Sequence, residues 1–404
     1  MLYRKNYVQK IAGFKDMDVI KVITGLRRSG KSTIMRQVQE YYEKTGISRD
    51  QILYYNFESY EYIDLLDDKK LYMHIKNEAH HIQGCCYLFL DEIQNVKNWQ
   101  KCINALQVDV PCDIYITGSN AKLLSGELAT YIAGRFIEIK IFPFSFKEYA
   151  AAQKDQNREK ESKVLFQEYL QYGGMPFVCY LNDKEKFKEY MNGVFSTIVL
   201  NDMISRNNVR NPLIMERVLT YAIDNIGHLI SASSIVKYLK NEQLKVSIDT
   251  VISYLKMGSD ALLFQKTPRR NLLGKEVLKT QEKYYISDHG FKQYLFHSNM
   301  RDIELVLENI ICIEMLRRGY DVSIGEVMRK EVDFVCRKNE ECLYIQVSYL
   351  MPDSSTRERE FAPLLLIRDN YPKYVLSMDE LDFSQQGIHH RNIIDFLLSD
   401  INEA

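Results

Sequence analysis

The first 145 residues alternate short apolar runs with longer amphipathic segments. Apolar and β-branched residues fill residues 19–24, and the segment that follows from Lys31 carries Ile34, Met35 and Val38 at helical spacing. Later apolar runs have the length of strands and are separated by turns or helical stretches; they are residues 51–57, 86–90, 113–117 and 136–141. Strands that alternate with helices are typical of a parallel sheet covered on both faces, so the pattern predicts an α/β fold.

The pattern changes after this part. Residues 146–212 are mostly helical, and their charged run at residues 154–161 indicates a solvated connection. Two later helices begin at the capping residues Ser231 and Ser247 and precede a pair of strands, as in a winged helix-turn-helix. A helix and three strands after residue 300 predict a further α/β domain. We therefore expect a core at 1–145, a helical lid or connector at 146–212, a winged helix at 213–297 and an α/β domain at 298–404.

Composition narrows the class of protein. The 404 residues include 46% hydrophobic residues and only 8 prolines, which is typical of an ordered protein of several domains. The net charge of −1 neither requires nor excludes a nucleic-acid partner. No apolar run approaches the roughly 18 residues needed to span a bilayer, and residues 1–5 lack the apolar region of a signal peptide. We expect a cytoplasmic protein with no membrane partner, whose 8 cysteines are reduced thiols.

The turn between the first strand and the first long helix has a specific chemistry. Residues 25–32 read GLRRSGKS and match the phosphate-binding pattern G-x-x-x-x-G-K-[ST]. Its glycines let consecutive backbone N–H groups turn inward, toward phosphate oxygens and the positive end of a helix. Lys31 would reach the β and γ phosphates, and Ser32 would supply a hydroxyl to Mg²⁺. The residues expected to bind ATP are Gly25, Arg28, Ser29, Gly30, Lys31, Ser32 and Thr33.

The apolar strand at residues 86–90 ends in two carboxylates, which is the form of a Walker B strand. Asp91 would enter the Mg²⁺ shell, and Glu92, which points elsewhere, would polarise the attacking water. A phosphate loop that binds ATP, together with these roles for Asp91 and Glu92, predicts an ATPase that converts ATP and water to ADP and phosphate.

Three other residues each have functional and structural interpretations. Asn120, in the turn after the strand at 113–117, could sense the γ-phosphate or hold the water, and it could equally cap a helix. Arg135 could stabilise transition-state charge in its own site or a neighbour's, or be a surface arginine. Arg28 could contact nucleotide or a partner subunit, or lie in solvent.

Five motifs resemble a group of bacterial and archaeal AAA-type P-loop ATPases whose C-terminal half is poorly characterised. The motifs are GLRRSGKST, YLFLDEIQNVKNW, ITGSNAKLLSGEL, AGRFIEIKIFPFSFKEY and YGGMP. The resemblance covers the whole chain. It implies a P-loop core with an additional strand, Lys31, Ser32, Asp91 and Glu92 in the roles above, and a sensor near Asn120.

The hairpin of the expected winged helix carries four cations that could contact DNA phosphates. They are Arg269, Arg270, Lys275 and Lys279. The same cations could belong to a solvated wing that docks on protein.

The last domain is similar to the restriction-endonuclease-like core, in which a helix glutamate, a strand aspartate and an E-x-K motif gather metal and water. Glu308 and Asp333 match this set, but Gln346 replaces the second acid and Ser348 replaces the lysine. A neutral amide is a poor Mg²⁺ ligand, and a serine cannot replace the ammonium group. We therefore expect a degenerate derivative that does not cleave.

The leading hypothesis is an ATPase whose nucleotide state rearranges a winged-helix and nuclease-like half that holds DNA or another partner, including a second copy of the chain. One alternative is an ATP-gated DNA nuclease. The other is a nucleotide-switched scaffold for protein assembly that binds no nucleic acid.

Overall fold

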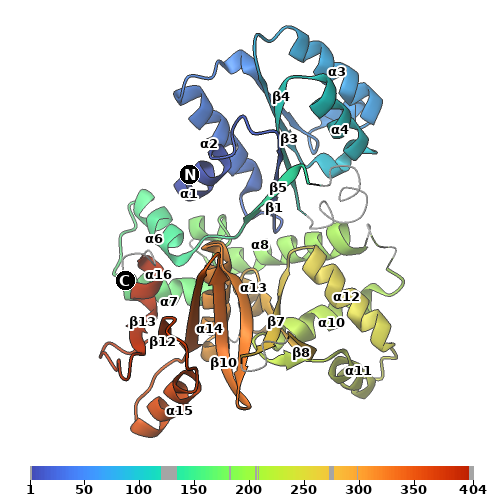
Figure 1. The fold of residues 1–404 in the computed structure, drawn as a ribbon. Coiled ribbons are helices and arrows are strands. Elements are labelled where there is room, and N and C mark those ends of the chain that lie inside the picture. The colour runs from blue at the N-terminus through green and yellow to red at the C-terminus, as the bar shows by residue number, and fades with distance from the viewer. Residues whose placement is uncertain are drawn as a thin grey trace. The chain divides into compact units, whose positions relative to one another are not determined.

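The computed structural model describes residues 2–119, 134–181, 183–204, 207, 209–272, 277–297 and 299–399 (Figure 1). The chain forms two compact units. Unit 1 comprises Met1–Ile141 with Asp260–Leu262, and unit 2 comprises Phe142–Ser259 with Leu263–Ala404. In the part of the chain that the structure describes, no helix is both long and apolar enough to cross a lipid bilayer.

Unit 1 contains the parallel sheet that the sequence predicts. Its strands are β1 (Ile20–Gly25), β2 (Ile52–Asn56), β3 (Cys86–Asp91), β4 (Cys112–Gly118) and β5 (Phe136–Ile141). Its α-helices are α1 (Lys5–Ala12), α2 (Lys31–Lys44), α3 (Asp68–His80) and α4 (Trp99–Asp109), with short 3₁₀ turns at Arg49–Gln51, Tyr60–Leu65 and Ile93–Asn95. The strand order is β2-β3-β4-β1-β5, and every neighbouring pair is parallel. The α/β prediction is confirmed, and β4 is the additional strand between the phosphate-loop strand and the Walker B strand.

Helices cover both faces of this sheet because alternate strand residues are apolar on each face. On one face, Ile23 and Phe89 pack with α1 and α2, where Ile34 and Val38 are fully buried. On the other face, strand residues such as Leu88 pack with α3 and α4. Figure 1 shows α1 and α2 on one side of the sheet and α3 and α4 on the other.

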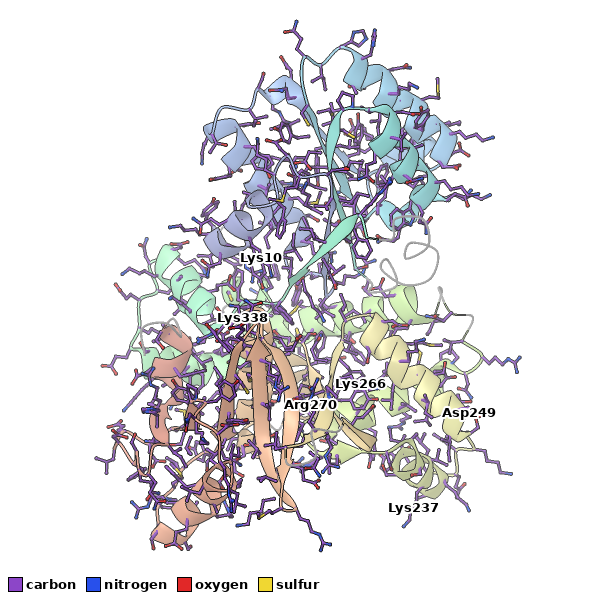
Figure 2. The ribbon with its side chains drawn as sticks, viewed as in Figure 1. Lys10, Lys237, Asp249, Lys266, Arg270 and Lys338 are labelled. Atoms are coloured by element: carbon purple, nitrogen blue, oxygen red, sulfur yellow. The ribbon has the colours of Figure 1, made fainter. Side chains whose placement is uncertain are left out.

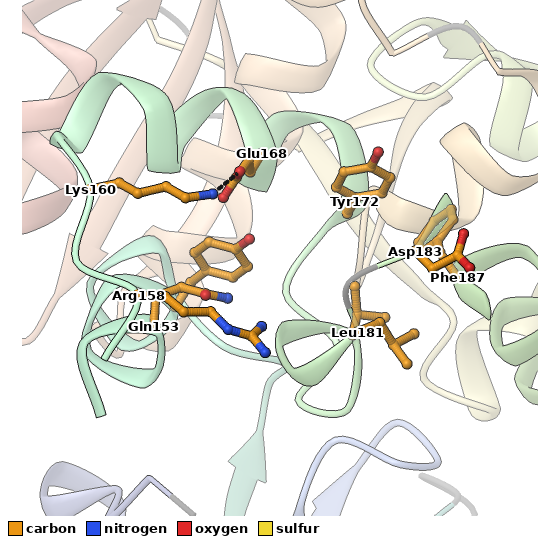
Figure 3. Close-up of a pocket in the computed structure, with 10 residues that line it drawn as sticks. Gln153, Arg158, Lys160, Glu168, Tyr172, Leu181, Asp183 and Phe187 are labelled. Carbon is orange, nitrogen blue, oxygen red and sulfur yellow. Dashed lines mark hydrogen bonds and ion pairs between the residues drawn. The ribbon is translucent and has the colours of Figure 1, made fainter. Parts of the chain in front are cut away.

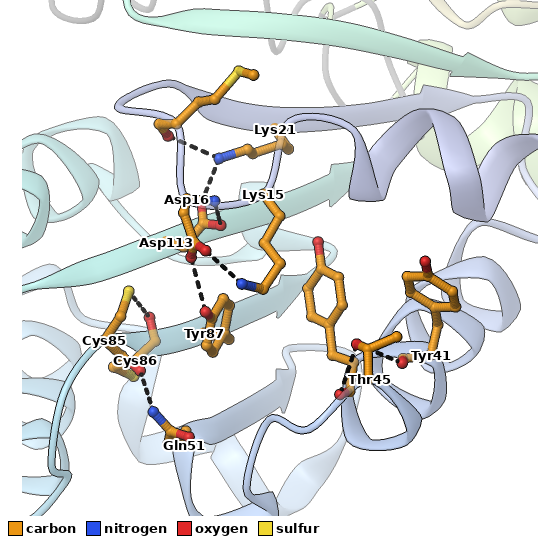
Figure 4. A network of polar contacts seen from close by, with 12 residues as sticks. Lys15, Asp16, Lys21, Tyr41, Thr45, Gln51, Cys85, Cys86, Tyr87 and Asp113 are labelled. Atoms are coloured by element: carbon orange, nitrogen blue, oxygen red, sulfur yellow. Dashed lines mark hydrogen bonds and ion pairs between the residues drawn. The ribbon is translucent and has the colours of Figure 1, made fainter.

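A polar network joins the amino ends of β1 and β4 (Figure 4). Lys21 and Asp113 form a buried ion pair. The hydroxyl of Tyr115 donates to Asp113 at 2.6 Å, and the backbone N–H of Asp16 donates to it at 2.9 Å. Tyr87 in turn donates to Asp16 at 2.8 Å. Buried charges need such partners, and these hold the edge of the sheet opposite the phosphate loop.

Unit 2 is built on an eight-stranded sheet in the order β13-β12-β11-β10-β9-β7-β8-β6. Its strands are β6 (Leu229–Ile230), β7 (Phe264–Asn271), β8 (Val277–Ile286), β9 (Asp321–Val327), β10 (Lys330–Lys338), β11 (Glu341–Val347), β12 (Lys373–Ser377) and β13 (His389–Asn392). Its helices are α6 (Phe146–Asp155), α7 (Ser162–Tyr172), α8 (Lys184–Thr197), α10 (Pro212–Asp224), α11 (Ala232–Asn241), α12 (Ile248–Asp260), α13 (Gly290–Phe296), α14 (Ile303–Arg317), α15 (Ser354–Leu365) and α16 (Ile393–Leu398), with a 3₁₀ turn at Val178–Tyr180 and a π-helical stretch at Ile198–Ile204.

The helices and hairpin of the expected winged helix form where the sequence places them. Ser231 caps α11, and the hydroxyl of Ser247 accepts the N–H of Thr250 in the first turn of α12. The hairpin strands β7 and β8 pair antiparallel, but β7 also pairs in parallel with β9. The sheet therefore runs across the boundary expected between residues 297 and 298, and the winged helix and the four-domain division stay predictions.

The YGGMP motif anchors the beginning of unit 2. The N–H of Phe144 donates to the carbonyl of Gly174 at 2.7 Å, and the N–H of Gly174 donates to Asp288 at 2.8 Å. A Cβ at Gly173 would lie 2.1 Å from Asp288, and one at Gly174 would lie 2.2 Å from the carbonyl oxygen of Phe144. The close approach of these three segments therefore requires both glycines.

Candidate active site

The phosphate loop connects the carboxyl end of β1 to the first turn of α2. Arg28 and Gly30 have positive φ angles of 66° and 100°, which is the left-handed backbone that turns successive N–H groups to one side. Gly25 pairs with Ile141 of β5, and a Cβ at Gly25 would lie 2.5 Å from the carbonyl oxygen of Ile141. The backbone geometry is that of an anion-binding loop at a helix N-terminus.

The side chain of Lys31 is buried across this loop. Its Nζ donates to the carbonyl oxygens of Gly25 at 3.1 Å and Leu26 at 3.4 Å, and lies 3.7 Å from Oε1 of Glu92. The ammonium of Lys31 thus lies between the loop and the acid that follows β3, which is where phosphate charge would need it.

Ser29 gives an independent test of whether the loop suits a phosphate. Its carbonyl accepts a hydrogen bond from the buried guanidinium of Arg4 at 3.3 Å. Its hydroxyl is buried and has no hydrogen-bond partner in the described chain. A buried hydroxyl that can donate fits the oxyanion chemistry of ATP.

Asp91, at the end of β3, is fully buried and is held by two hydroxyl donors. Tyr54 of β2 donates to Oδ2 at 2.9 Å, and Thr117 of β4 donates to Oδ1. Burial, and then the charge of Asp91, raise the pKa of Tyr54, so its hydroxyl keeps the proton that it donates. The carboxylate is fixed in orientation before any metal ligand is considered.

Glu92 leaves the strand direction because its φ is 54° and its ψ is 46°. Its backbone N–H donates to the hydroxyl of Thr117 at 2.9 Å, and its carboxylate accepts from the amide of Gln94. Thr117 therefore contacts the carboxylate of Asp91 and the backbone of Glu92, and the two carboxylates have different partners.

No local sequence motif marks Thr117 or Tyr54 as a partner of Asp91. Each lies on a strand beside β3, and only the parallel register places them next to Asp91. Thr117 comes two residues before the polar turn at Ser119, and this was the one signal that could have identified it.

The other candidate residues near the phosphate site differ in exposure, and one of them is not described. Arg28 is exposed, while its neighbour Arg27 pairs with Glu58 at 3.0 Å. Ser119 is fully buried. Asn120 lies outside the described residues.

Arg135 lies beside the amino end of the sheet. Its carbonyl accepts the N–H of Ile20, at the start of β1, and β5 runs parallel to β1. The phosphate loop follows Gly25 at the other end of this strand, about 16 Å away at 3.3 Å per residue. A role for Arg135 in the phosphate site of its own chain does not fit this geometry, so only a role in a neighbouring copy stays a proposal.

Of the four wing cations, the structure describes the side chains of Arg269 and Arg270, and neither is fully exposed. Arg269 pairs with Glu326 of β9 at 2.8 Å and is largely buried. Arg270 is half-buried in the same sheet, where Figure 2 labels it. Lys275 lies outside the described residues, as does the side chain of Lys279. The two arginines that can be placed contribute to the sheet rather than to an open basic surface.

The exposed face of α12 is also poor in cations. Ile248 and Ile252 are 49% and 52% exposed, next to exposed Asp249 and Lys256. Two isoleucines, one acid and one lysine are a weak match to a DNA groove and a better match to a protein surface.

The endonuclease-like residues converge, with a lysine that the sequence did not suggest. The Nζ of Lys283, on β8, lies 3.4 Å from Glu308 of α14 and 2.6 Å from Glu331 of β10. Burial raises the pKa of both Glu308 and Asp333, and the charge of Glu308 raises that of Asp333 further. Burial opposes the charge of Lys283, but the three carboxylates outweigh it and raise the pKa of Lys283.

Gln346 joins this cluster, but Ser348 does not. The amide oxygen of Gln346 accepts from the N–H of Asp333 at 3.4 Å, and its nitrogen donates to Glu360 at 3.2 Å. Ser348 instead donates to the carbonyl of Leu350 at 3.5 Å. Within the described ranges, no three or more His, Cys, Asp or Glu residues are arranged to hold a metal ion.

Comparisons with known proteins agree with the fold. A family model described as an AAA domain matches residues 18–150, and one described as a domain of unknown function matches residues 163–302. An uncharacterized protein of Haemophilus influenzae is 40% identical over 399 residues, which are 98% of this chain and 99% of the relative. An uncharacterized protein of Methanocaldococcus jannaschii is 32% identical over 362 residues, 84% of this chain and 77% of the relative. A solved Walker-type ATPase of Pyrococcus abyssi has a TM-score of 0.50 and 14% identity, covering 73% of this chain and 96% of that one.

Proposed function

The chain belongs to a family of P-loop ATPases in which an AAA domain precedes a domain of unknown function, and we propose that it binds ATP with Mg²⁺ and hydrolyses it. The observation that carries this proposal is the meeting of the phosphate loop and two oriented carboxylates at the carboxyl ends of β1 and β3. Ligands of parallel α/β sheets bind at this edge.

Each residue has a distinct role in this proposal. The backbone N–H groups of residues 25–33 and the ammonium of Lys31 bind the phosphates, and Ser32 and Asp91 hold Mg²⁺. The metal ion supplies charge neutralisation at the phosphate oxygens when bound. Glu92 accepts a proton from the attacking water, and Asn120 contacts the γ-phosphate or this water. Arg28 and Thr33 contact nucleotide at the entrance of the loop.

Two substitutions separate binding from hydrolysis. Lys31→Ala is expected to remove ATP binding, because the ammonium of Lys31 is the buried cation that lies between the loop carbonyls and Glu92. Glu92→Gln is expected to retain ATP binding while phosphate release falls by about 100-fold or more, since the amide cannot act as a base. Phosphate release and binding of a fluorescent ATP analogue measure the two effects.

Lys44→Ala is the matched control, since Lys44 is exposed at the far end of the same helix. Phosphate release at the wild-type rate by Lys31→Ala would refute the proposal.

We further propose that nucleotide state rearranges unit 2 and that unit 2 holds a protein partner. The pairing of Arg269 with Glu326 and the exposed isoleucines of α12 favour protein over DNA. ATP hydrolysis measured with and without duplex DNA tests this choice. We expect DNA to leave the hydrolysis rate unchanged at both low and physiological salt. Salt-sensitive stimulation by DNA would restore the DNA-binding hypothesis.

ATP-gated cleavage lacks support, because the neutral amide of Gln346 stands where the second acid is needed.

A further inference from the structure

Unit 2 contains a pocket of about 300 Å³ among its first three helices (Figure 3). The charged run at residues 154–161 was expected to be a solvated connection, but Arg158 from this run is half-buried and lines the pocket. The residues that define its chemistry are Tyr149, Arg158, Tyr172, Val178, Leu181 and Phe187. The volume is at the lower end of the range for small-ligand sites.

Three of these side chains are hydrogen-bond donors with no acceptor. Tyr149 is only 4% exposed, yet neither its hydroxyl nor that of Tyr172 makes a hydrogen bond within the described chain. The guanidinium of Arg158 likewise forms no ion pair or hydrogen bond with any residue that the structure describes. The Tyr149 side chain is buried while its hydroxyl opens into the pocket, so a ligand in the pocket can supply the acceptor that the described chain does not.

The three donors line one pocket, and Tyr172 and Arg158 both affect the pKa of Tyr149. Burial raises the pKa of Tyr149, with further contributions from Glu168 and Tyr172, while the charge of Arg158 acts in the opposite direction. Tyr149 therefore stays protonated and can donate, and it lies within electrostatic reach of the other two donors. A ligand must supply the acceptor oxygens.

The other residues that line the pocket restrict the polarity and charge of the ligand. Val178, Leu181 and Phe187 form an apolar side, and the ring of Phe187 meets that of Tyr172 edge to face at 5.1 Å. Lys160 and Glu168 neutralise each other, as the dashed line in Figure 3 shows, so they add no net charge.

Among the described residues, Arg158 has no ion-pair partner in this pocket. Asp183, which also lines the pocket, caps α8 by accepting the N–H of Glu185. A single guanidinium beside a carboxylate favours a monoanion over a phosphate dianion.

We propose that this pocket binds a carboxylate attached to an apolar or aromatic group, with the carboxylate on Arg158, Tyr149 and Tyr172 and the apolar group against Phe187 and Leu181. The carboxylate comes from a free small acid or from the C-terminus of a peptide that ends in an apolar residue. The chemistry at the pocket is the same for both sources.

Titration of the full-length protein with two matched pairs of probes tests the proposal and separates the sources. The first pair is 3-phenylpropanoate and the neutral 3-phenylpropanamide, and the second is acetyl-Gly-Gly-Phe with a free or an amidated C-terminus. Saturation-transfer NMR and calorimetry measure binding. Each carboxylate is expected to bind at least about tenfold more tightly than its amide, since a charge-assisted bidentate bond is lost. The tighter of the two carboxylates identifies the source.

Variants locate the binding. Arg158→Met is expected to weaken carboxylate binding at least about tenfold, and Tyr149→Phe to weaken it severalfold while keeping the ring. Lys154→Met is the control, because Lys154 belongs to the same charged run but is 72% exposed and pairs with Glu159. Unchanged circular dichroism and melting verify the fold of each variant. Equal binding of acids and amides, no binding of either carboxylate, or wild-type affinity in Arg158→Met would each overturn the proposal.

Discussion

At the residue scale, Thr117 links the two acids of the candidate active site. Its hydroxyl donates to Asp91 and accepts the N–H of Glu92 at 2.9 Å. One side chain therefore fixes the acid proposed to hold Mg²⁺ and the acid proposed to act on water. Partners that orient ligands in this way commonly affect catalysis more than binding.

Thr117→Val is expected to lower kcat about tenfold and to leave the Kd for ATP within about threefold, because the loop and Lys31 remain. The substitution keeps the shape of the side chain and removes only the hydroxyl. Steady-state phosphate release together with nucleotide titration measures both quantities. Thr45→Val, at the end of α2, is the matched control, and a kcat equal to wild type in Thr117→Val would contradict the role.

At the scale of elements, Lys283 connects three pieces of unit 2. It lies on β8, while its carboxylate partners lie on α14 and β10. The sequence placed Lys283 in a wing and the acids in another domain, and no motif relates them. The ion cluster thus joins the hairpin to the α/β domain, and its lysine comes from β8 rather than from position 348.

Lys283→Met is expected to lower the free energy of unfolding of unit 2 by about 3 kcal/mol, because it leaves buried carboxylates without a cation. Urea unfolding followed by circular dichroism measures the change. Lys266→Met is the control: Lys266, on neighbouring β7, pairs with Glu282 but is 51% exposed, so a change within about 0.5 kcal/mol is expected. A similar small effect for Lys283→Met would show that the cluster does not stabilise the unit.

At the scale of the whole molecule, the chain forms two compact units with separate sheets. The phosphate loop and its acids belong to unit 1, while the ion cluster and the Arg158 pocket belong to unit 2. The single tryptophan, Trp99, is buried in unit 1, so its fluorescence reports on that unit alone.

A non-hydrolysable ATP analogue with Mg²⁺ is expected to stabilise the unit that contains Trp99 by about 2.7 kcal/mol at 100 times its Kd. In urea titrations, the analogue should move the Trp99 fluorescence transition to a higher urea concentration. Lys283→Met should instead move mainly the unfolding transition of unit 2, which circular dichroism detects and Trp99 fluorescence does not. Binding in the other unit would leave the fluorescence midpoint unchanged.

Local sequence patterns were sufficient to predict the main helices and strands and the phosphate loop. The strand and helix around Lys31, the acids at the end of β3 and the serine starts of α11 and α12 depend on neighbours only a few residues away. The parallel sheet followed from the alternation of strands and helices.

Tertiary structure decided what depends on register and on distant segments. Thr117 and Tyr54 reach Asp91 only because β4 and β2 flank β3, and Arg135 lies at the far edge only because β5 is parallel to β1. Lys283 joins Glu308 because β7 pairs with β9 and continues one sheet across an expected boundary. The sequence by itself determined a nucleotide loop with its two acids, since these are local, while strand order decided which distant side chains surround them.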